Sequence, residues 1–212
     1  MVPTDDERDI WHRKLGHLSL KYISKLSKKD LVKGLPNISW KTKLLCESCQ
    51  KGKQLKASFK SKNVVSTSRP LELLHIDLFR PTRTPSLGGK KYGLVIVDDY
   101  TRYTWVHFLA HKHESYKAFE VFSKRVQNEK GFCIASVRSD HGKEFENSEF
   151  TTFCERSVIF HSFSSPRTPQ QNGVVERKNR TLQEMARTLL CQNSLPKHLW
   201  AEAVNTACYI QN

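Results

Sequence analysis

The sequence predicts an α/β protein in which a mixed sheet is flanked by helices, with a smaller helical domain ahead of it. Two observations predict the sheet. Three short β-rich runs follow one another between residues 71 and 110, and segments of helical and strand character alternate after them. The smaller domain is indicated by a helical stretch and closely spaced histidines and cysteines within the first 50 residues. A chain of 212 residues has room for one ordinary domain and a small one.

Charge is the strongest compositional signal. Lys and Arg number 35 against 21 Asp and Glu, a formal net charge of +14, and such an excess points first to a polyanionic partner such as nucleic acid. No apolar run approaches the roughly 18 residues of a membrane span, and the first residues are too polar for a signal peptide. The six cysteines do not resemble a disulfide framework. We therefore expect an intracellular chain with no membrane partner.

A pair of histidines and a pair of cysteines have the spacing of metal ligands. His12 and His17 are five residues apart, and Cys46 and Cys49 are three apart. Imidazoles and thiolates suit a tetrahedral Zn²⁺ site, and four protein ligands leave no open position, so the zinc would be structural. A segment this small buries little core, and a metal would supply the missing stability. The alternative is two surface histidines beside an unrelated Cys-x-x-Cys.

A basic stretch from residue 50 to residue 70 separates the two parts of the chain. It contains several lysines and serines and few apolar residues, as in a flexible, solvated linker. It either lies along a phosphate backbone or is ordinary solvated surface. We place the zinc-binding domain and this linker in residues 1–66 and the larger domain in residues 67–212.

The larger domain is predicted to begin with an antiparallel meander and to continue with alternating helices and strands. Turn signals separate the first three strands, and Gly131 is a plausible helix C-cap. The expected strands are Leu71–Phe79, Tyr92–Asp98, Thr104–Ala110, Phe132–Val137 and Val158–His161. The expected helices are Glu114–Lys130, Glu149–Arg156, Gln171–Leu190 and Leu199–Asn212.

Three carboxylates lie where a sheet of this kind places ligand sites. Asp77 and Asp140 each follow an apolar strand, and the ends of neighbouring strands bring such side chains together. Close carboxylates repel one another unless a cation lies between them, and oxygen ligands favour Mg²⁺ or Mn²⁺. Glu176 would approach from a helix, on a face next to the one that this helix buries. Spacing alone leaves open that Asp140 only forms a turn and that Glu176 is an ordinary exposed residue.

Several motifs surround these three acids: His75–Phe79, Val97–Tyr103, Ser139–Phe145, Phe163–Pro166 and Gln170–Arg180. In this order they resemble the integrase core of copia-type LTR retrotransposons. The region from Trp11 to Cys49 is similar to the pre-integrase zinc region that precedes this core, so the resemblance covers nearly the whole chain.

The resemblance implies a ribonuclease H-like fold with a mixed five-stranded sheet and a polynucleotidyl transferase activity. Asp77, Asp140 and Glu176 would form its acidic triad and bind Mg²⁺ or Mn²⁺. The enzyme would trim the 3′ ends of the element's DNA copy and join them to target DNA by transesterification.

The implied partners are the element ends and target DNA. A homo-oligomer is expected, because integration joins two ends. The expected location is the nucleus at the site of integration and, beforehand, cytoplasmic particles. The residues expected to contact nucleic acid are Lys143, Asn172, Arg177, Lys178, Asn179 and Arg180.

One position departs from the pattern that this resemblance implies. Arg80-Pro81 stands where such integrases usually carry a glycine before the proline. The chain also ends inside a predicted helix, so we expect a fragment of a longer polyprotein. Two alternatives follow: a catalytically inactive DNA-binding or assembly module, and a nuclease that only hydrolyses. The zinc region ahead of the core argues against the nuclease.

Overall fold

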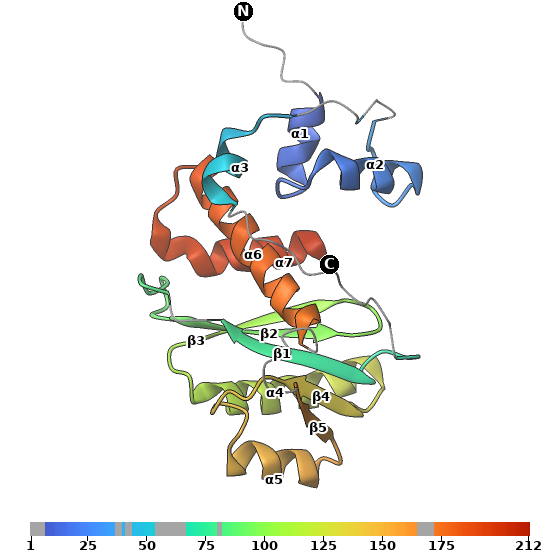
Figure 1. The fold of residues 1–212 in the computed structure, drawn as a ribbon, viewed down its shortest axis with the longest axis vertical. Coiled ribbons are helices and arrows are strands. Elements are labelled where there is room, and N and C mark those ends of the chain that lie inside the picture. Colours follow the sequence, from blue (N-terminus) through green and yellow to red (C-terminus); the bar gives the residue numbers. More distant parts are fainter. Residues whose placement is uncertain (1–6, 37–39, 41–43, 54–66, 80–81, 165–171) are drawn as a thin grey trace, which may run out of the picture.

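The computed structural model describes residues 7–36, 40, 44–53, 67–79, 82–164 and 172–212. Its N-terminal module consists of three short helices, α1 (Glu7–Lys14), α2 (Leu20–Lys28) and α3 (Glu47–Gly52). Figure 1 shows this module at one end of the molecule, above the long helix α6 and away from the sheet. The first and third of these helices had not been predicted.

A five-stranded sheet forms the centre of the larger part. Its order is β3-β2-β1-β4-β5, with β2 antiparallel to both β1 and β3, and with β4 and β5 running parallel to β1. This confirms the predicted meander and the mixed five-stranded sheet. The strands are β1 (Leu73–Phe79), β2 (Tyr92–Asp98), β3 (Thr104–Leu109), β4 (Ser136–Ser139) and β5 (Phe160–Phe163).

Helices cover both faces of the sheet (Figure 1). On one side, α4 (Glu114–Lys130) and α5 (Ser148–Arg156) enclose a core that includes Phe119 and Phe150. On the other, α6 (Gly173–Gln192) and α7 (Trp200–Gln211) enclose a second core that includes Leu182. A short 3₁₀ turn, η1 (Lys197–Leu199), joins α6 to α7. None of the helices in the described part of the chain combines the length and the apolar character needed to cross a bilayer.

The two parallel strands β4 and β5 begin later in the sequence than predicted. The run from Phe132 is apolar, but Phe132 itself is exposed, and pairing with β1 starts only at Ser136. Val158 is 86% exposed with a φ of +54°, because it turns the chain out of α5 before β5 starts. Both errors arose from treating apolar residues as strand residues where the chain is still leaving a helix.

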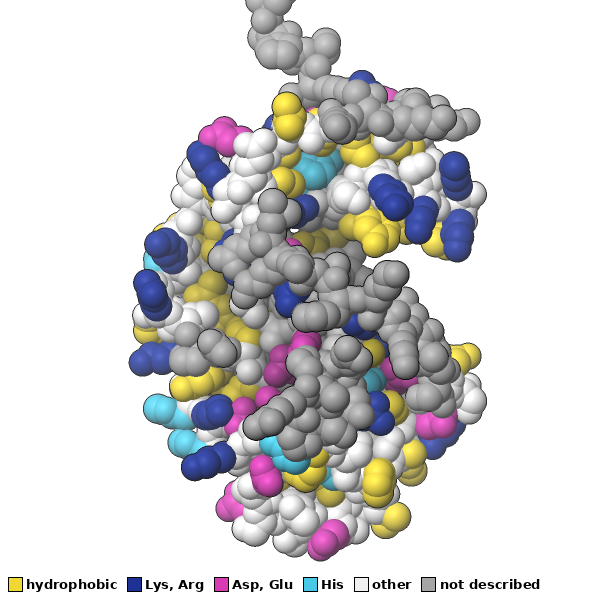
Figure 2. Space-filling model, in the orientation of Figure 1, with side chains coloured by type: hydrophobic (Ala, Val, Ile, Leu, Met, Phe, Trp, Pro, Cys, Tyr) yellow, Lys and Arg dark blue, Asp and Glu magenta, His cyan; other side chains and the backbone are white. Residues whose placement is uncertain are grey.

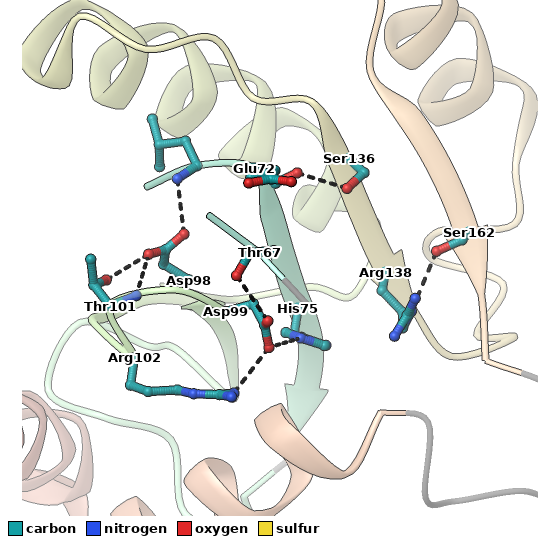
Figure 3. A network of polar contacts seen from close by, with 11 residues as sticks. Thr67, Glu72, His75, Asp98, Asp99, Thr101, Arg102, Ser136, Arg138 and Ser162 are labelled. Carbon is teal, nitrogen blue, oxygen red and sulfur yellow. Dashed lines mark hydrogen bonds and ion pairs between the residues drawn. The ribbon is translucent and has the colours of Figure 1, made fainter. Parts of the chain in front are cut away.

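Two adjacent aspartates at the end of β2, Asp98 and Asp99, hold the turn to β3 and connect it to β1. Asp98 Oδ1 accepts from the Leu71 amide at 2.9 Å, and Asp98 Oδ2 accepts from the Thr101 amide at 2.8 Å. The buried Asp99 carboxylate lies 3.0 Å from His75 Nε2 and 3.1 Å from an Arg102 guanidinium nitrogen (Figure 3). The contacts are those of turn-forming, hydrogen-bonding residues, the role expected for such aspartates.

Candidate active site and metal centre

The two histidines of the N-terminal module are brought together by the way helix α1 ends. The Gly16 amide donates to Arg13 O at 3.0 Å and the His17 amide donates to His12 O at 2.7 Å, the paired bonds of a Schellman motif with Gly16 at its left-handed position. Gly16 has a φ of +62°, which favours glycine. The five-residue spacing of His12 and His17 is therefore the spacing across this helix end.

The four predicted zinc ligands converge. Their ligand atoms all lie within 4.8 Å of one another. His17 Nδ1 is 3.4 Å from Cys46 Sγ and 3.2 Å from His12 Nε2, and Cys49 Sγ is 3.3 Å from His12 Nε2. Zn–N bonds of about 2.05 Å and Zn–S bonds of about 2.3 Å give tetrahedral edges of roughly 3.3–3.8 Å. The cluster fits a small zinc-binding domain.

The protonation of these ligands also fits a metal site. Burial is the main cause that lowers the pKa of both His12 and His17, so both imidazoles are held neutral. Burial raises the pKa of Cys49 to about 11, so this thiol would have to lose its proton when zinc binds. The second ring nitrogen of each histidine has an acceptor, Leu18 O for His12 and Gln192 Oε1 for His17. Metal-binding histidines usually have such an outer partner.

The second candidate site lies at the centre of the sheet, on the face covered by α6. Along β1 the buried Leu74 and Ile76 face the α4 side and Phe79 faces the α6 side, so alternation places Asp77 on the α6 side. Strand β4 is the parallel neighbour of β1, with His75 beside Arg138. Asp140 is the first residue after β4, and Asp77 lies two residues beyond the last paired position of β1, so both acids lie at the same end of the β1–β4 pair.

Helix α6 brings the third carboxylate to the same place. Asp77, Asp140 and Glu176 all line one cavity of about 620 Å³. Glu176 is in the first turn of α6, where the helix dipole favours a negative charge. Asp140 Oδ1 also accepts from the Gly142 amide at 3.1 Å, so Asp140 forms a turn as well as lining the cavity.

The carboxylates of this cavity repel one another. Burial raises the pKa of Asp77, and the charges of Asp140 and Glu144 raise it further, while a hydrogen bond from Asn179 lowers it. Burial also raises the pKa of Glu176, followed by the charges of Asp77 and Asp140. A divalent cation would relieve this repulsion, and carboxylate oxygens are the donors that Mg²⁺ and Mn²⁺ favour.

The donor set suits a hard cation, but its oxygens are more widely spaced than the zinc ligands. Among the described residues, the His12, His17, Cys46 and Cys49 cluster is the group whose potential ligand atoms all lie within 4.8 Å of one another. A cation shared by Asp77, Asp140 and Glu176 therefore requires these side chains to turn toward each other.

Asn179 was expected to contact DNA, but its side chain is buried and hydrogen-bonded to Asp77. Its side chain is 6% exposed, and its Nδ2 donates to Asp77 Oδ2 at 2.7 Å. Gln183 Nε2 donates in turn to Asn179 Oδ1 at 2.5 Å. This chain of hydrogen bonds along α6 fixes one carboxylate oxygen of Asp77, and it indicates a positioning role for Asn179.

The other residues predicted to contact DNA divide into two groups. Lys143, Arg177 and Arg180 are exposed, and Arg180 lines the acidic cavity. Asn172 is 1% exposed, with its Nδ2 donating to Ile76 O at 3.3 Å, and Lys178 donates to Gln211 Oε1 at 3.2 Å on the α7 side. Their DNA contacts stay predictions. Arg80 lies outside the described residues.

Several residues that line the cavity were not predicted from the sequence. Glu184 and Arg187 follow Arg180 and Gln183 at four-residue steps, so helical spacing already contained a signal for them. Lys112 has no such signal, because it follows β3 and reaches the cavity through an ion pair of 2.8 Å with Glu144. Lys112, Arg180 and Arg187 give the acidic cavity a basic rim.

Positive charge is spread over the surface rather than confined to one element. Figure 2 shows Lys and Arg side chains over the N-terminal helices and along the left edge, and acidic side chains near the middle of the face. Helix α2 and the turn after it contribute a row of exposed lysines: Lys21, Lys25, Lys28, Lys29 and Lys33. Such a surface suits a polyanionic partner.

Two family models match the chain in succession. One, described as the GAG-pre-integrase domain, matches residues 1–54, and the other, described as the integrase core domain, matches residues 67–169. The first covers the zinc-type ligands, and the second covers Asp77 and Asp140.

Similar curated proteins are Retrovirus-related Pol polyproteins of plants. The chain is 38% identical over 207 residues to that of transposon TNT 1-94 from Nicotiana tabacum, covering 96% of this chain and 15% of the polyprotein. For transposons RE2 and RE1 of Arabidopsis thaliana the identities are 34% over 203 residues and 32% over 204, covering 95% of this chain each and 14% and 13% of the polyproteins. The chain thus spans a small part of these relatives. The chain therefore matches the GAG-pre-integrase and integrase core domains in succession, and its curated homologues are Pol polyproteins of plant copia-type retrotransposons.

Proposed function

We propose that this chain is a metal-dependent polynucleotidyl transferase that processes the 3′ ends of an element's DNA copy and joins them to target DNA. The observation that carries the proposal is a cavity lined by carboxylates from β1, from the residue after β4 and from α6. The match to the integrase core domain supports the same reaction class.

The proposed roles follow from the positions of the side chains. Asp77, Asp140 and Glu176 would hold Mg²⁺ or Mn²⁺. Divalent cations bound there would activate the attacking oxygen and stabilise the leaving oxygen in an in-line phosphoryl displacement. Asn179 keeps one Asp77 oxygen oriented, and Arg180 on the rim is available to a phosphate group.

The proposed partner is DNA, both the element ends and the target. Exposed basic residues near the cavity, Lys143, Arg177 and Arg180, would contact the phosphate backbone, and the lysines of α2 would extend this surface. Zn²⁺ in the N-terminal module would be structural. We further propose that the active species is a multimer that works in the nucleus, because joining two DNA ends requires two active sites.

A strand-transfer assay tests the proposal. The substrate is a labelled duplex with the terminal sequence of the element that encodes the chain, incubated with Mg²⁺ or Mn²⁺. We expect joined products from the unaltered chain, none from Asp140→Asn or Glu176→Gln, and unchanged joining by Glu155→Gln, a matched change at an exposed position of α5. Joining that survives Asp140→Asn would overturn the assignment of the triad.

The same assay separates an active integrase from an inactive DNA-binding remnant. The Arg80-Pro81 sequence is the feature that favours the remnant. If the unaltered chain binds the duplex without joining it and Arg80→Gly restores joining, the defect lies at residue 80. If neither version joins strands while both bind DNA, the transferase proposal fails and the binding function remains.

A further inference from the structure

The N-terminal module is docked on the C-terminal half of α6, the helix that carries Glu176 at its other end (Figure 1). Arg187 Nε donates to Gly52 O at 3.1 Å. A Cβ atom at Gly52 would lie 2.5 Å from Thr188 Oγ1 and 2.9 Å from Thr188 Cα. Helix α3 therefore approaches α6 so closely that glycine is required at the contact.

One zinc-type ligand takes its outer hydrogen bond from α6. His17 is 1% exposed, its Nδ1 faces the cysteines, and its Nε2 contacts Gln192 Oε1 in the last turn of α6. The outer partner of His12 is the backbone oxygen of Leu18, inside the module. One imidazole is thus oriented locally, and the other is oriented by a residue 175 positions away in the sequence.

The end of α6 is a favourable place for this contact. Backbone carbonyls give the C-terminus of a helix partial negative charge, which attracts an N–H donor. A histidine that binds a metal through Nδ1 carries its proton on Nε2 and needs an acceptor there. The Gln192 amide oxygen supplies that acceptor.

We propose that Gln192 is a positioning residue for the zinc ligand His17 and that it couples zinc binding by the N-terminal module to helix α6. This inference rests on the proposed zinc site. Coupling is reciprocal: zinc loading stabilises the last turns of α6, and docking on α6 tightens zinc binding. Glu176 and Gln192 are sixteen positions apart on one helix, a distance of about 24 Å along its axis. Zinc loading thereby fixes the module relative to the active-site cavity.

Zinc affinity measured by competition with a chromogenic chelator tests the coupling on the whole chain. In Gln192→Leu the acceptor is lost with little change of size, and we expect affinity to fall about 10- to 100-fold. Gln192→Glu keeps an acceptor and should stay within a few-fold of the unaltered chain. Asn193→Ala, at the exposed neighbour whose side chain bonds only within α6, is the matched control and should leave affinity unchanged.

Amide hydrogen exchange provides a readout of the helix itself. Zinc should slow exchange of residues 184–192 in the unaltered chain and in Gln192→Glu, but not in Gln192→Leu. Gly52→Ala, which keeps Gln192 but pushes α3 away from Thr188, should weaken zinc binding and abolish the same protection. If Gln192→Leu does not fold, Gly52→Ala still tests whether zinc binding is coupled to α6.

Two outcomes are distinguishable. An unaltered chain that binds no stoichiometric zinc overturns the proposed zinc site itself. An unaltered chain that binds zinc with the same affinity as Gln192→Leu and Gly52→Ala overturns the coupling and leaves the zinc site standing.

Discussion

Replacing Asp77 by asparagine should stabilise the metal-free chain while it removes a ligand from the cavity. Burial and the charges of Asp140 and Glu144 raise the pKa of Asp77, so the ionised carboxylate is unfavourable when no cation is bound. An asparagine oxygen at this position still accepts from Asn179 Nδ2, which lies 2.7 Å from Asp77 Oδ2. The substitution therefore removes repulsion and keeps the hydrogen bond.

The expected gain is about 1 kcal/mol, within the roughly 0.5–2 kcal/mol typical of single stabilising changes. For a chain of about this size it corresponds to a rise in Tm of about 2–4 °C. Thermal unfolding in zinc-containing buffer without Mg²⁺ or Mn²⁺ measures it. Added Mn²⁺ should then raise the Tm of the unaltered chain. At one hundred times the Kd, the gain in its free energy of unfolding is about 2.7 kcal/mol. Mn²⁺ should leave the Tm of Asp77→Asn unaffected.

Asp98→Asn is the matched control, because it makes the same chemical change where the carboxylate is satisfied by hydrogen bonds from Leu71 and Thr101. In Asp98→Asn an amide nitrogen would face one of these donors, which should lower the free energy of unfolding by about 1–3 kcal/mol. A lower Tm for metal-free Asp77→Asn, or a Mn²⁺ shift that persists in it, would refute the reasoning, since Asp77 would then be a structural acceptor.

Three further substitutions test separate parts of the structure. Cys46→Ser should abolish stoichiometric zinc binding, measured by metal analysis, and lower the helical signal in circular dichroism; full zinc content would contradict the cluster. Asn147→Ala removes the N-cap of α5, whose Oδ1 accepts from the Phe150 amide at 2.8 Å, and should cost about 1 kcal/mol in urea unfolding; no loss would show that the cap is dispensable. His107→Leu should make stability less dependent on pH. Burial lowers the pKa of His107, so the unfolded chain binds more protons below about pH 6.5 and stability falls between pH 7 and 5; an equally steep fall in the variant would exclude this source.

Local signals in the sequence predicted some elements well. Helix α4 begins and ends where expected, because its apolar residues keep helical spacing and Gly131 adopts the left-handed cap with a φ of +69°. The zinc-type cluster was also predicted, since its pairs are each local in sequence. Strand β4 was placed too early, because an apolar run does not reveal which residues find a pairing partner.

Long-range contacts were not predictable from one sequence. Asn179 lies on the helical face expected to meet DNA, yet its partner is Asp77, 102 residues away. The Gln192 contact with His17 spans 175 residues and joins two parts that the sequence divides. Only the fold brings these side chains together, and hydrogen-bond partners at such separations have no periodicity to reveal them.

The most direct test of the proposed active site is the anomalous scattering of a crystal of the chain soaked in Mn²⁺. We predict Mn²⁺ in the cavity, coordinated by oxygens of Asp77, Asp140 and Glu176, which turn toward one another to share it. A well-occupied Mn²⁺ elsewhere, with the three carboxylates unchanged and the cavity empty at saturating metal, would contradict the account.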